Sequence, residues 1–511
     1  MKKVMTITAI LTLSAVCAAG QVKDTLSINA RTFQWSDPFT SSGTMKAREL
    51  SDAVMLLAPY SSYSRAEGRF DLRKEDNAMV IQEGDGLIQG SFNAESFLTL
   101  DRNSAVSGNV SYERGQKKNV VWNETSDFDL LSPYVLLDSL GGNLQKEQYS
   151  FSGAYSKKGE NLIWMLKGGY RALHEYRTID PRPRNITSDM NVRGSVGHTF
   201  RKYTLMAAAG YRRYQQSQGV EFVSPVGANT NLFHGTGLGN DFVRFESTGT
   251  YSNTRYKGYG LDGGILLRSA SGNIDAGMNG SFFSVTRHLT SQNEAPITVL
   301  YTRKVNAFAS WKIFTEKKFN AALIGDVTYR RKDGDENVID NTHTGDYERL
   351  MALRMYANND LDAVLKAVIR KSDDERRLTL EPFTRFAYES EKYMYPQSST
   401  FVASITGGME AGFARKKNTW IIDGKISGEW TGCLSSSFEV ASVAGREKFH
   451  DAWESMYRKM MDNRIGVGLN LMVHKEINGS TGIYSRIRLK EIHFGSGDWT
   501  TLAAVSAGIA F

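Results

Sequence analysis

Hydrophobic and polar residues alternate with a period of two along much of the chain. In the segment 464–475 one face consists of Ile465, Val467, Leu469, Leu471 and Val473. The residues between them are mostly glycine or polar, and segments 161–173 and 319–331 alternate in the same way. Successive side chains of a strand point to opposite faces, so this pattern predicts strands with one face in an apolar medium.

Eighteen such strands are predicted, with sixteen as the alternative count. They are expected at residues 63–74, 86–99, 104–114, 148–157, 161–173, 188–200, 203–215, 255–268, 273–287, 298–313, 319–331, 361–371, 376–390, 400–414, 419–431, 464–475, 480–494 and 499–511. Most are roughly 10–14 residues long, whereas strands of soluble sheets usually have about 5–6.

Aromatic residues recur near the ends of these segments, as in the two girdles of a membrane barrel. They are Tyr112, Tyr203, Tyr211, Trp311, Phe314, Phe319, Tyr329, Trp420 and Trp430. The connections are alternately short and long, and the long ones are expected at 115–147, 174–187, 216–254, 331–360 and 432–463. Short periplasmic turns and long extracellular loops are typical of outer-membrane barrels.

We therefore predict an all-β fold in which residues 63–511 form one large closed antiparallel transmembrane β-barrel. A soluble β-sandwich, whose apolar faces would pack on one another, is the competing interpretation. The composition suits either fold, because aromatic residues make up 11% of the chain and only 9 residues are proline.

The first twenty residues have the pattern of an export signal. Two lysines precede an apolar stretch over residues 4–16, and small residues at 18–20 fit a cleavage site. The stretch is too short for a membrane helix, which needs about 20 residues. Residues 1–20 are therefore expected to be a signal peptide, with a lipid anchor at Cys17 as the alternative.

Residues 21–62 lack sustained alternation and contain a break at Asp37-Pro38. They are expected to form either a small plug that enters the barrel or a periplasmic segment outside it. Once the signal is removed, Cys433 is the one remaining cysteine, so no internal disulfide is expected.

The final segment alternates as far as Phe511. One face consists of Ala503, Val505, Ala507, Ile509 and Phe511, and the other of small residues. A terminal aromatic on such a strand resembles the signal that the outer-membrane assembly machinery reads, although Ile509 replaces the usual second aromatic. Phe511 is therefore expected to be an assembly signal, and the barrel assembly machinery a partner.

Two loop phrases add a family resemblance. They are LSPYVLLDS at 131–139 and DPRPRN at 180–185. Together with the export signal and the Phe511 ending, they resemble an uncharacterised family of Bacteroidota outer-membrane β-barrels over roughly residues 60–511. The resemblance implies a porin- or transporter-like barrel in the outer membrane of a Gram-negative bacterium, and it implies no catalytic residues.

Basic residues lie on the face that is expected to point into the lumen. They are Lys167, Arg171, Arg193, Lys304, Arg330, Arg486, Arg488 and Lys490. A cation facing lipid would cost about 2–4 kcal/mol at the bilayer midplane, so the inward placement is favoured. A ladder of cations would favour anions in a pore. Alternatively, these cations pair with Asp326, Glu381 or Glu389 across the lumen and fill it.

Two predicted loops contain further candidates. Arg182 and Arg184 in DPRPRN could contact an anion or lipopolysaccharide, or Asp180 could pair with one of them in an ordinary rigid loop. Residues 445–463 have apolar residues near helical spacing, which predicts a short amphipathic helix. This helix could narrow the mouth, contact a surface partner or simply pack on its own loop.

The chain carries no HExxH motif, phosphate-binding loop or dinucleotide fingerprint, and its 8 histidines are scattered. We therefore predict no enzyme activity, no cofactor, no metal and no nucleic-acid partner. The leading function is a porin-like or substrate-selective channel for small solutes, surrounded by outer-membrane lipid and lipopolysaccharide. The alternative is a plugged barrel for binding or adhesion, or an accessory to a TonB-dependent receptor or a surface lipoprotein.

Overall fold

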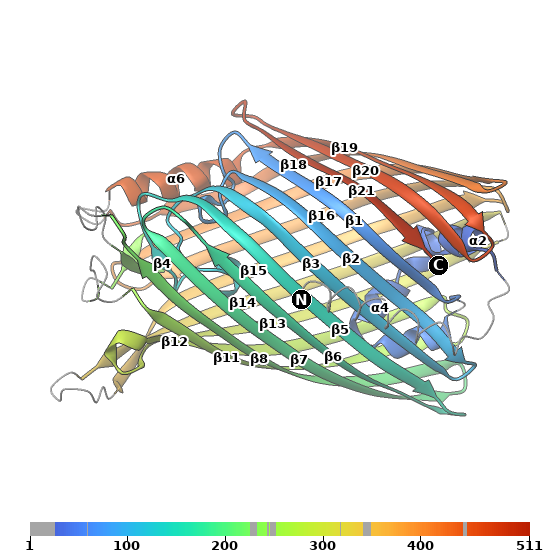
Figure 1. Cartoon of the computed structure of the whole chain (residues 1–511), viewed down its shortest axis with the longest axis horizontal. Coiled ribbons are helices and arrows are strands. Elements are labelled where there is room, and N and C mark those ends of the chain that lie inside the picture. The colour runs from blue at the N-terminus through green and yellow to red at the C-terminus, as the bar shows by residue number, and fades with distance from the viewer. Residues whose placement is uncertain are drawn as a thin grey trace, which may run out of the picture.

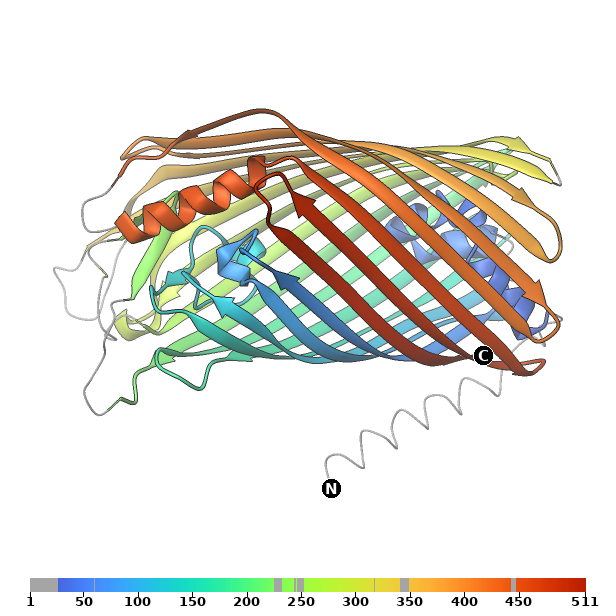
Figure 2. The same cartoon turned by 90° about the horizontal axis from the view of Figure 1, so that it is seen from above.

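The computed structural model describes residues 26–58, 60–224, 232–242, 245, 252–316, 318–340, 349–442 and 447–511, so the expected signal peptide lies outside the described residues. Within them, an 18-stranded antiparallel sheet closes into a barrel (Figure 1, Figure 2). The predicted all-β barrel and its strand count are confirmed.

The strands of the wall follow one another in chain order. They are β1 (Tyr63–Glu75), β2 (Gly86–Asp101), β3 (Ser104–Val120), β5 (Gly142–Lys158), β6 (Leu162–Tyr176), β7 (Arg182–Phe200), β8 (Tyr203–Glu221), β11 (Thr254–Ser269), β12 (Ile274–Leu289), β13 (Ala295–Thr315), β14 (Phe319–Ile339), β15 (Arg349–Ser372), β16 (Arg376–Tyr393), β17 (Ser398–Lys417), β18 (Trp420–Glu439), β19 (Arg464–Asn478), β20 (Thr481–Phe494) and β21 (Trp499–Ala510).

The pairing of β21 with β1 closes the wall. Their register runs from Arg65 opposite Ala510 to Glu75 opposite Thr500. Beyond it, the Phe511 N–H donates to the Ser64 carbonyl at 2.8 Å, and the Ser64 N–H donates back at 3.2 Å. Every wall strand therefore has two neighbours, and the wall has no open edge among the residues that the structure describes.

The outward face of the wall is apolar. Leu261, Ile265 and Ile426 are each about 60% exposed on it. Most aromatic residues predicted for the girdles are also exposed, namely Tyr203, Tyr211, Trp311, Phe314, Phe319, Tyr329, Trp420 and Trp430. A continuous apolar belt around a closed barrel is the surface that lipid covers. Among the helices described, none is long and apolar enough to cross a membrane.

Short turns join the strands at one end, as predicted; for example, residues 201–202 join β7 to β8. At the other end all five predicted loops are too long, because the strands continue into them; for example, β7 begins at Arg182 and β14 continues to Ile339. Here the strands extend past the apolar belt, so both faces carry polar residues and the alternation disappears. Cross-strand ion pairs such as Arg303–Asp333, at 2.8 Å, connect these extensions.

Segments from several connections fold together at this end. The small elements are η2 (Ile81–Glu83), α5 (Phe128–Leu131), β4 (Leu136–Leu137), β9 (Phe233–Gly237), β10 (Asn240–Asp241) and η4 (Thr290–Gln292). β10, β9 and β4 form a separate three-stranded sheet. The predicted amphipathic helix is present as α6 (Glu447–Met461), which lies at the same end in Figure 1. Trp122, Tyr134, Leu238 and Phe449 are buried in one shared core here.

The N-terminal segment folds into α2 (Ile28–Trp35), α3 (Pro38–Ser41), α4 (Thr44–Leu50) and η1 (Asp52–Leu57). These helices lie inside the wall at the end that carries the short turns (Figure 2). Leu50, Val54 and Met55 are buried there against wall residues that include Phe97 and Ile163.

We predict that Ile265→Arg destabilises the barrel by about 2–4 kcal/mol in lipid, because it places a cation near the middle of the outward belt. Urea unfolding of the barrel in lipid vesicles measures this change. Ser281→Arg, which adds the same cation on the inward face, should change the free energy of unfolding far less. Equal losses from the two variants would contradict the assignment of the faces.

Candidate functional site

One side of the N-terminal segment is held by the carboxylate of Asp52. This group lies 2.8 Å from Lys167 Nζ and 3.0 Å from Arg48 Nε. It also accepts a hydrogen bond from Ser107 Oγ at 3.1 Å. Lys167 belongs to β6 and Ser107 to β3, so one buried carboxylate connects the segment to two wall strands.

The opposite side is held by arginines of the wall. Arg377 of β16 donates to the Phe33 carbonyl at 2.7 Å and to Ser36 Oγ at 2.8 Å. Its guanidinium also lies over the Phe33 ring, 4.4 Å from the centroid. Arg370 of β15 pairs with Asp37. The segment therefore spans the lumen, held by the Asp52 ion pairs and the packing of Leu50, Val54 and Met55 on one side and by the wall arginines on the other.

Five of the eight predicted lumen cations pair with carboxylates. Lys167 pairs with Asp52, Arg171 with Asp127 and Asp189, Arg193 with Asp262, Arg330 with Asp129 and Asp360, and Lys490 with Glu429. The anions proposed from the sequence have other contacts: Asp326 pairs with Lys46, Glu381 with Lys366 and Lys425, and Glu389 accepts from Asn358.

The wall formed by β20, β21 and β1 keeps a cationic surface. Arg486 lies opposite Ser506, which lies opposite Arg69 on the next strand. Arg488 lies opposite Ala504, so small side chains separate the arginines. Within the described part of the chain, neither Arg486 nor Arg488 pairs with a carboxylate. Lys304, on the far wall, likewise has no ion pair among these residues.

Cavities lie between the N-terminal segment and the inward-folded loops. One of about 510 Å³ is lined by charged residues that include Asp127, Arg171 and Arg212. Another of about 380 Å³ is lined by Lys46, Arg193, Asp262 and Lys304 among others. The lumen thus contains polar space that is covered at both ends.

The two arginines of DPRPRN lie on the outer rim. Both belong to β7 and share the outward face with Ile186, so their placement in a loop is corrected. Arg182 pairs with Asp180 at 2.7 Å. Arg184 is exposed and has no ion pair among the described residues.

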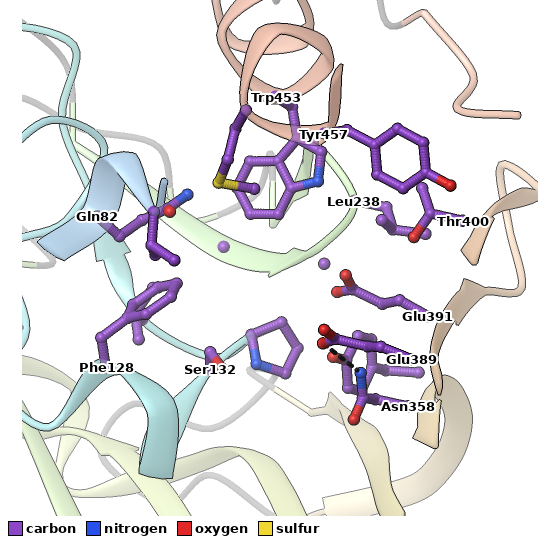
Figure 3. Close-up of a pocket in the computed structure, with 18 of the residues that line it drawn as sticks. Gln82, Phe128, Ser132, Leu238, Asn358, Glu389, Glu391, Thr400, Trp453 and Tyr457 are labelled. Carbon is purple, nitrogen blue, oxygen red and sulfur yellow. Dashed lines mark hydrogen bonds between the residues drawn. The ribbon is translucent and has the colours of Figure 1, made fainter. Parts of the chain in front are cut away.

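A pocket of about 300 Å³ lies at the mouth, under α6 (Figure 3). Apolar side chains of α6 form one side of it, namely Phe449, Trp453, Met456, Tyr457 and Met460. Phe128 of α5 and Leu238 contribute further apolar surface. Residues of β14, β15 and β16 form the polar side.

Several contacts fix α6 over this pocket. The Phe449 ring is 4.6 Å from the Trp122 ring, centroid to centroid. The Tyr457 hydroxyl accepts from the Ser437 N–H at 3.1 Å and lies within hydrogen-bond distance of the Phe401 carbonyl. These contacts join α6 to the loop before β4 and to strands β17 and β18.

The polar side of the pocket contains cations that are already paired. Arg330 contacts both carboxylate oxygens of Asp129 at 2.9 Å and Asp360 at 2.8 Å. Lys332 is buried and donates to the Asp129 carbonyl and to Ser132 Oγ. Of these residues, only Arg330 was predicted from the sequence as a site residue. No sequence motif around Asp129 or Ser132 indicates that their loop folds back to contact Arg330 and Lys332.

A buried charge cluster supports the loop that brings Asp129 into the mouth. Arg177 lies 2.8 Å from Glu124 and 3.5 Å from Asp138, and all three side chains are almost fully buried. Burial and the neighbouring Asp138 raise the pKa of Glu124 well above its usual range, against the opposite effect of Arg177. The folded loop therefore holds a proton on Glu124 more tightly than the unfolded chain does.

No group of three or more histidine, cysteine or acidic residues suited to a metal occurs in the part of the chain that the structure describes. The polar groups of the lumen and mouth can instead bind and orient a solute through ion pairs and hydrogen bonds.

The sequence pattern of a family of unknown function (DUF6850) matches residues 53–511. No curated protein matches the chain in sequence. One solved structure with a similar backbone trace is the ferric enterobactin receptor of Pseudomonas aeruginosa. The two chains are 10% identical and superpose with a TM-score of 0.36, and the match covers 88% of this chain and 80% of that chain. The ferric preacinetobactin receptor of Acinetobacter baumannii has 8% identity, a TM-score of 0.37 and the same coverage. Such low values say nothing about what this chain binds.

We predict that the mouth loop loosens as the pH rises. Because the folded-state pKa of Glu124 is raised, its proton stabilises the folded loop at low pH, and this contribution is lost as pH rises from the ordinary value of about 4.3 through the raised value. Proteolysis within 121–141, with a protease active from pH 6 to 9, should increase with pH. Glu124→Gln should remove that increase, whereas Glu160→Gln in a short turn should keep it. An unchanged increase in Glu124→Gln would contradict the assignment.

Proposed function

The chain belongs to the family of unknown function DUF6850, and we propose that it is a gated, substrate-selective channel for small solutes in the outer membrane of a Gram-negative bacterium. The observation that carries this proposal is a lumen with polar cavities, covered at one end by the N-terminal segment and at the other by the loops and α6. An 18-stranded barrel is wide enough to pass a solute once these parts move.

In this proposal, residues 26–58 act as a small plug. Their contacts with β15 and β16 are largely ion pairs and hydrogen bonds, which water can replace when the contact opens. The apolar contact on this side is small and joins Phe39 to Val368 and Ala322. The apolar packing of Leu50, Val54 and Met55 on the other wall is costlier to separate. Movement should therefore begin on the arginine side and reach η1 last, so that full opening requires η1 to leave the wall as well.

A plugged barrel that only binds or supports a partner, such as a TonB-dependent receptor or a surface lipoprotein, is the second candidate. The contacts that hold the N-terminal segment and α6 in place are compatible with this role, but the polar cavities inside the lumen favour the passage of a solute. A protein that uses only its outer surface has no need of unfilled polar space between two closures.

The outer surface supports the proposed location. The apolar belt requires a bilayer, and Arg182 and Arg184 extend from its loop-side rim, where lipopolysaccharide phosphates would lie. The outward Phe511 next to Ser64 supports its proposed role as the signal for the barrel assembly machinery.

We expect a disulfide between the plug and the wall to lock the channel. Ser51 Oγ and Ser195 Oγ are 2.6 Å apart, so Ser51→Cys and Ser195→Cys place two sulfurs within bonding reach. In a Cys433→Ser background, the oxidised protein should be silent in planar bilayers, and reduction should restore brief openings. The Cys433→Ser parent should respond to neither treatment. Equal conductance in the oxidised and reduced protein would contradict a moving plug.

We also expect the open channel to prefer anions, because Arg486 and Arg488 leave a cationic wall above the plug. The double variant Arg486→Gln/Arg488→Gln should move the reversal potential in a potassium chloride gradient towards that of a non-selective pore. Arg184→Gln, which removes a cation from the outer face, should leave it unchanged. A wild-type channel that selects cations would contradict this assignment.

A further inference from the structure

We infer that the mouth pocket under α6 is a binding site for a small organic cation that carries an apolar or aromatic group. The inference goes beyond the proposed channel, since it concerns what the mouth recognises whether or not the lumen conducts. It rests on two carboxylates, on the aromatic surface that faces them and on the cavity between the two (Figure 3).

The carboxylates are those of Glu389 and Glu391. They are two residues apart on β16, so both lie on its inward face, and Figure 3 shows both pointing into the pocket. Glu389 accepts a hydrogen bond from Asn358 at 3.3 Å. Within the described residues, neither carboxylate forms an ion pair.

Both cations of the pocket make their direct contacts with other groups. Arg330 is bound by Asp129 and Asp360, and Lys332 by the loop that carries Asp129 and Ser132. Together with Asp129 and Asp360, the two glutamates place four carboxylates around the two cations Arg330 and Lys332. This excess of negative charge favours a positively charged ligand over an anion.

The opposite side of the pocket suits the rest of such a ligand. Trp453 lies above the two carboxylates and Phe128 lies across from them (Figure 3). A tryptophan face attracts an organic cation more strongly than other aromatic faces do. Met456 and Met460 add flexible apolar surface that can adapt to a bound group. The volume of about 300 Å³ is at the lower end of ligand pockets, so the ligand must be small.

The test uses the refolded full chain in nanodiscs and titrates it with phenethylammonium by calorimetry. Phenethyl alcohol and phenylacetate serve as neutral and anionic analogues with the same ring. We expect only the ammonium compound to bind. Glu389→Gln/Glu391→Gln should weaken its binding at least tenfold, and Trp453→Ala should also weaken it. Glu454→Gln, which removes a carboxylate that pairs with Arg458 on the same helix, should bind as the wild type does.

Equal binding of the three compounds, no binding at all, or unchanged binding in the double glutamine variant would overturn the inference. The single variant Glu391→Gln replaces the double variant if circular dichroism shows that the latter fails to fold. The oxidised Ser51→Cys/Ser195→Cys protein separates this result from that of the channel, because its tether lies at the other end of the barrel. It should bind phenethylammonium normally even though it does not conduct.

Discussion

The pairing of β1 with β21 is the contact on which the rest of the molecule depends. Backbone N–H and C=O groups cannot stay unpaired in hydrocarbon, so a sheet in a bilayer has to close on itself. Residues more than four hundred positions apart therefore have to meet in one register, from Arg65 with Ala510 to Glu75 with Thr500. Closure also determines which face of each strand meets lipid, and hence which residues are free to carry charge inside.

Closing eighteen strands encloses more space than wall side chains can fill. The chain fills it with two bodies of different character. The mouth is packed around an aromatic core that includes Trp122, Tyr134 and Phe449. The N-terminal segment is bound by apolar packing together with the Asp52 ion pairs on one side, and largely by charged contacts on the other. Charged contacts exchange more easily with water than buried apolar surface does. This difference makes the N-terminal segment, rather than the mouth core, the part suited to move.

The strands could be predicted from the sequence because each carries one side chain towards lipid and the next towards the lumen. The strand ends beyond the belt could not, since there both faces are wet and ion pairs such as Arg303–Asp333 replace the alternation. The mouth pocket was also out of reach. Helix α6 has a periodic pattern and was predicted, but its meeting with Phe128 and Glu391 depends on how distant loops fold into the barrel. Glu389 was considered only as a partner for lumen cations.

The two ends of the lumen present opposite charges to a solute. At the mouth, Glu389 and Glu391 face the lumen and form no ion pair among the described residues. On the wall near the plug, Arg486 and Arg488 likewise form no ion pair among these residues. A molecule with a positive group and a negative group would find a favourable site for each charge, at the mouth first and on the wall next. Selectivity in this barrel would therefore arise from the order of the two charged surfaces rather than from the width of the pore.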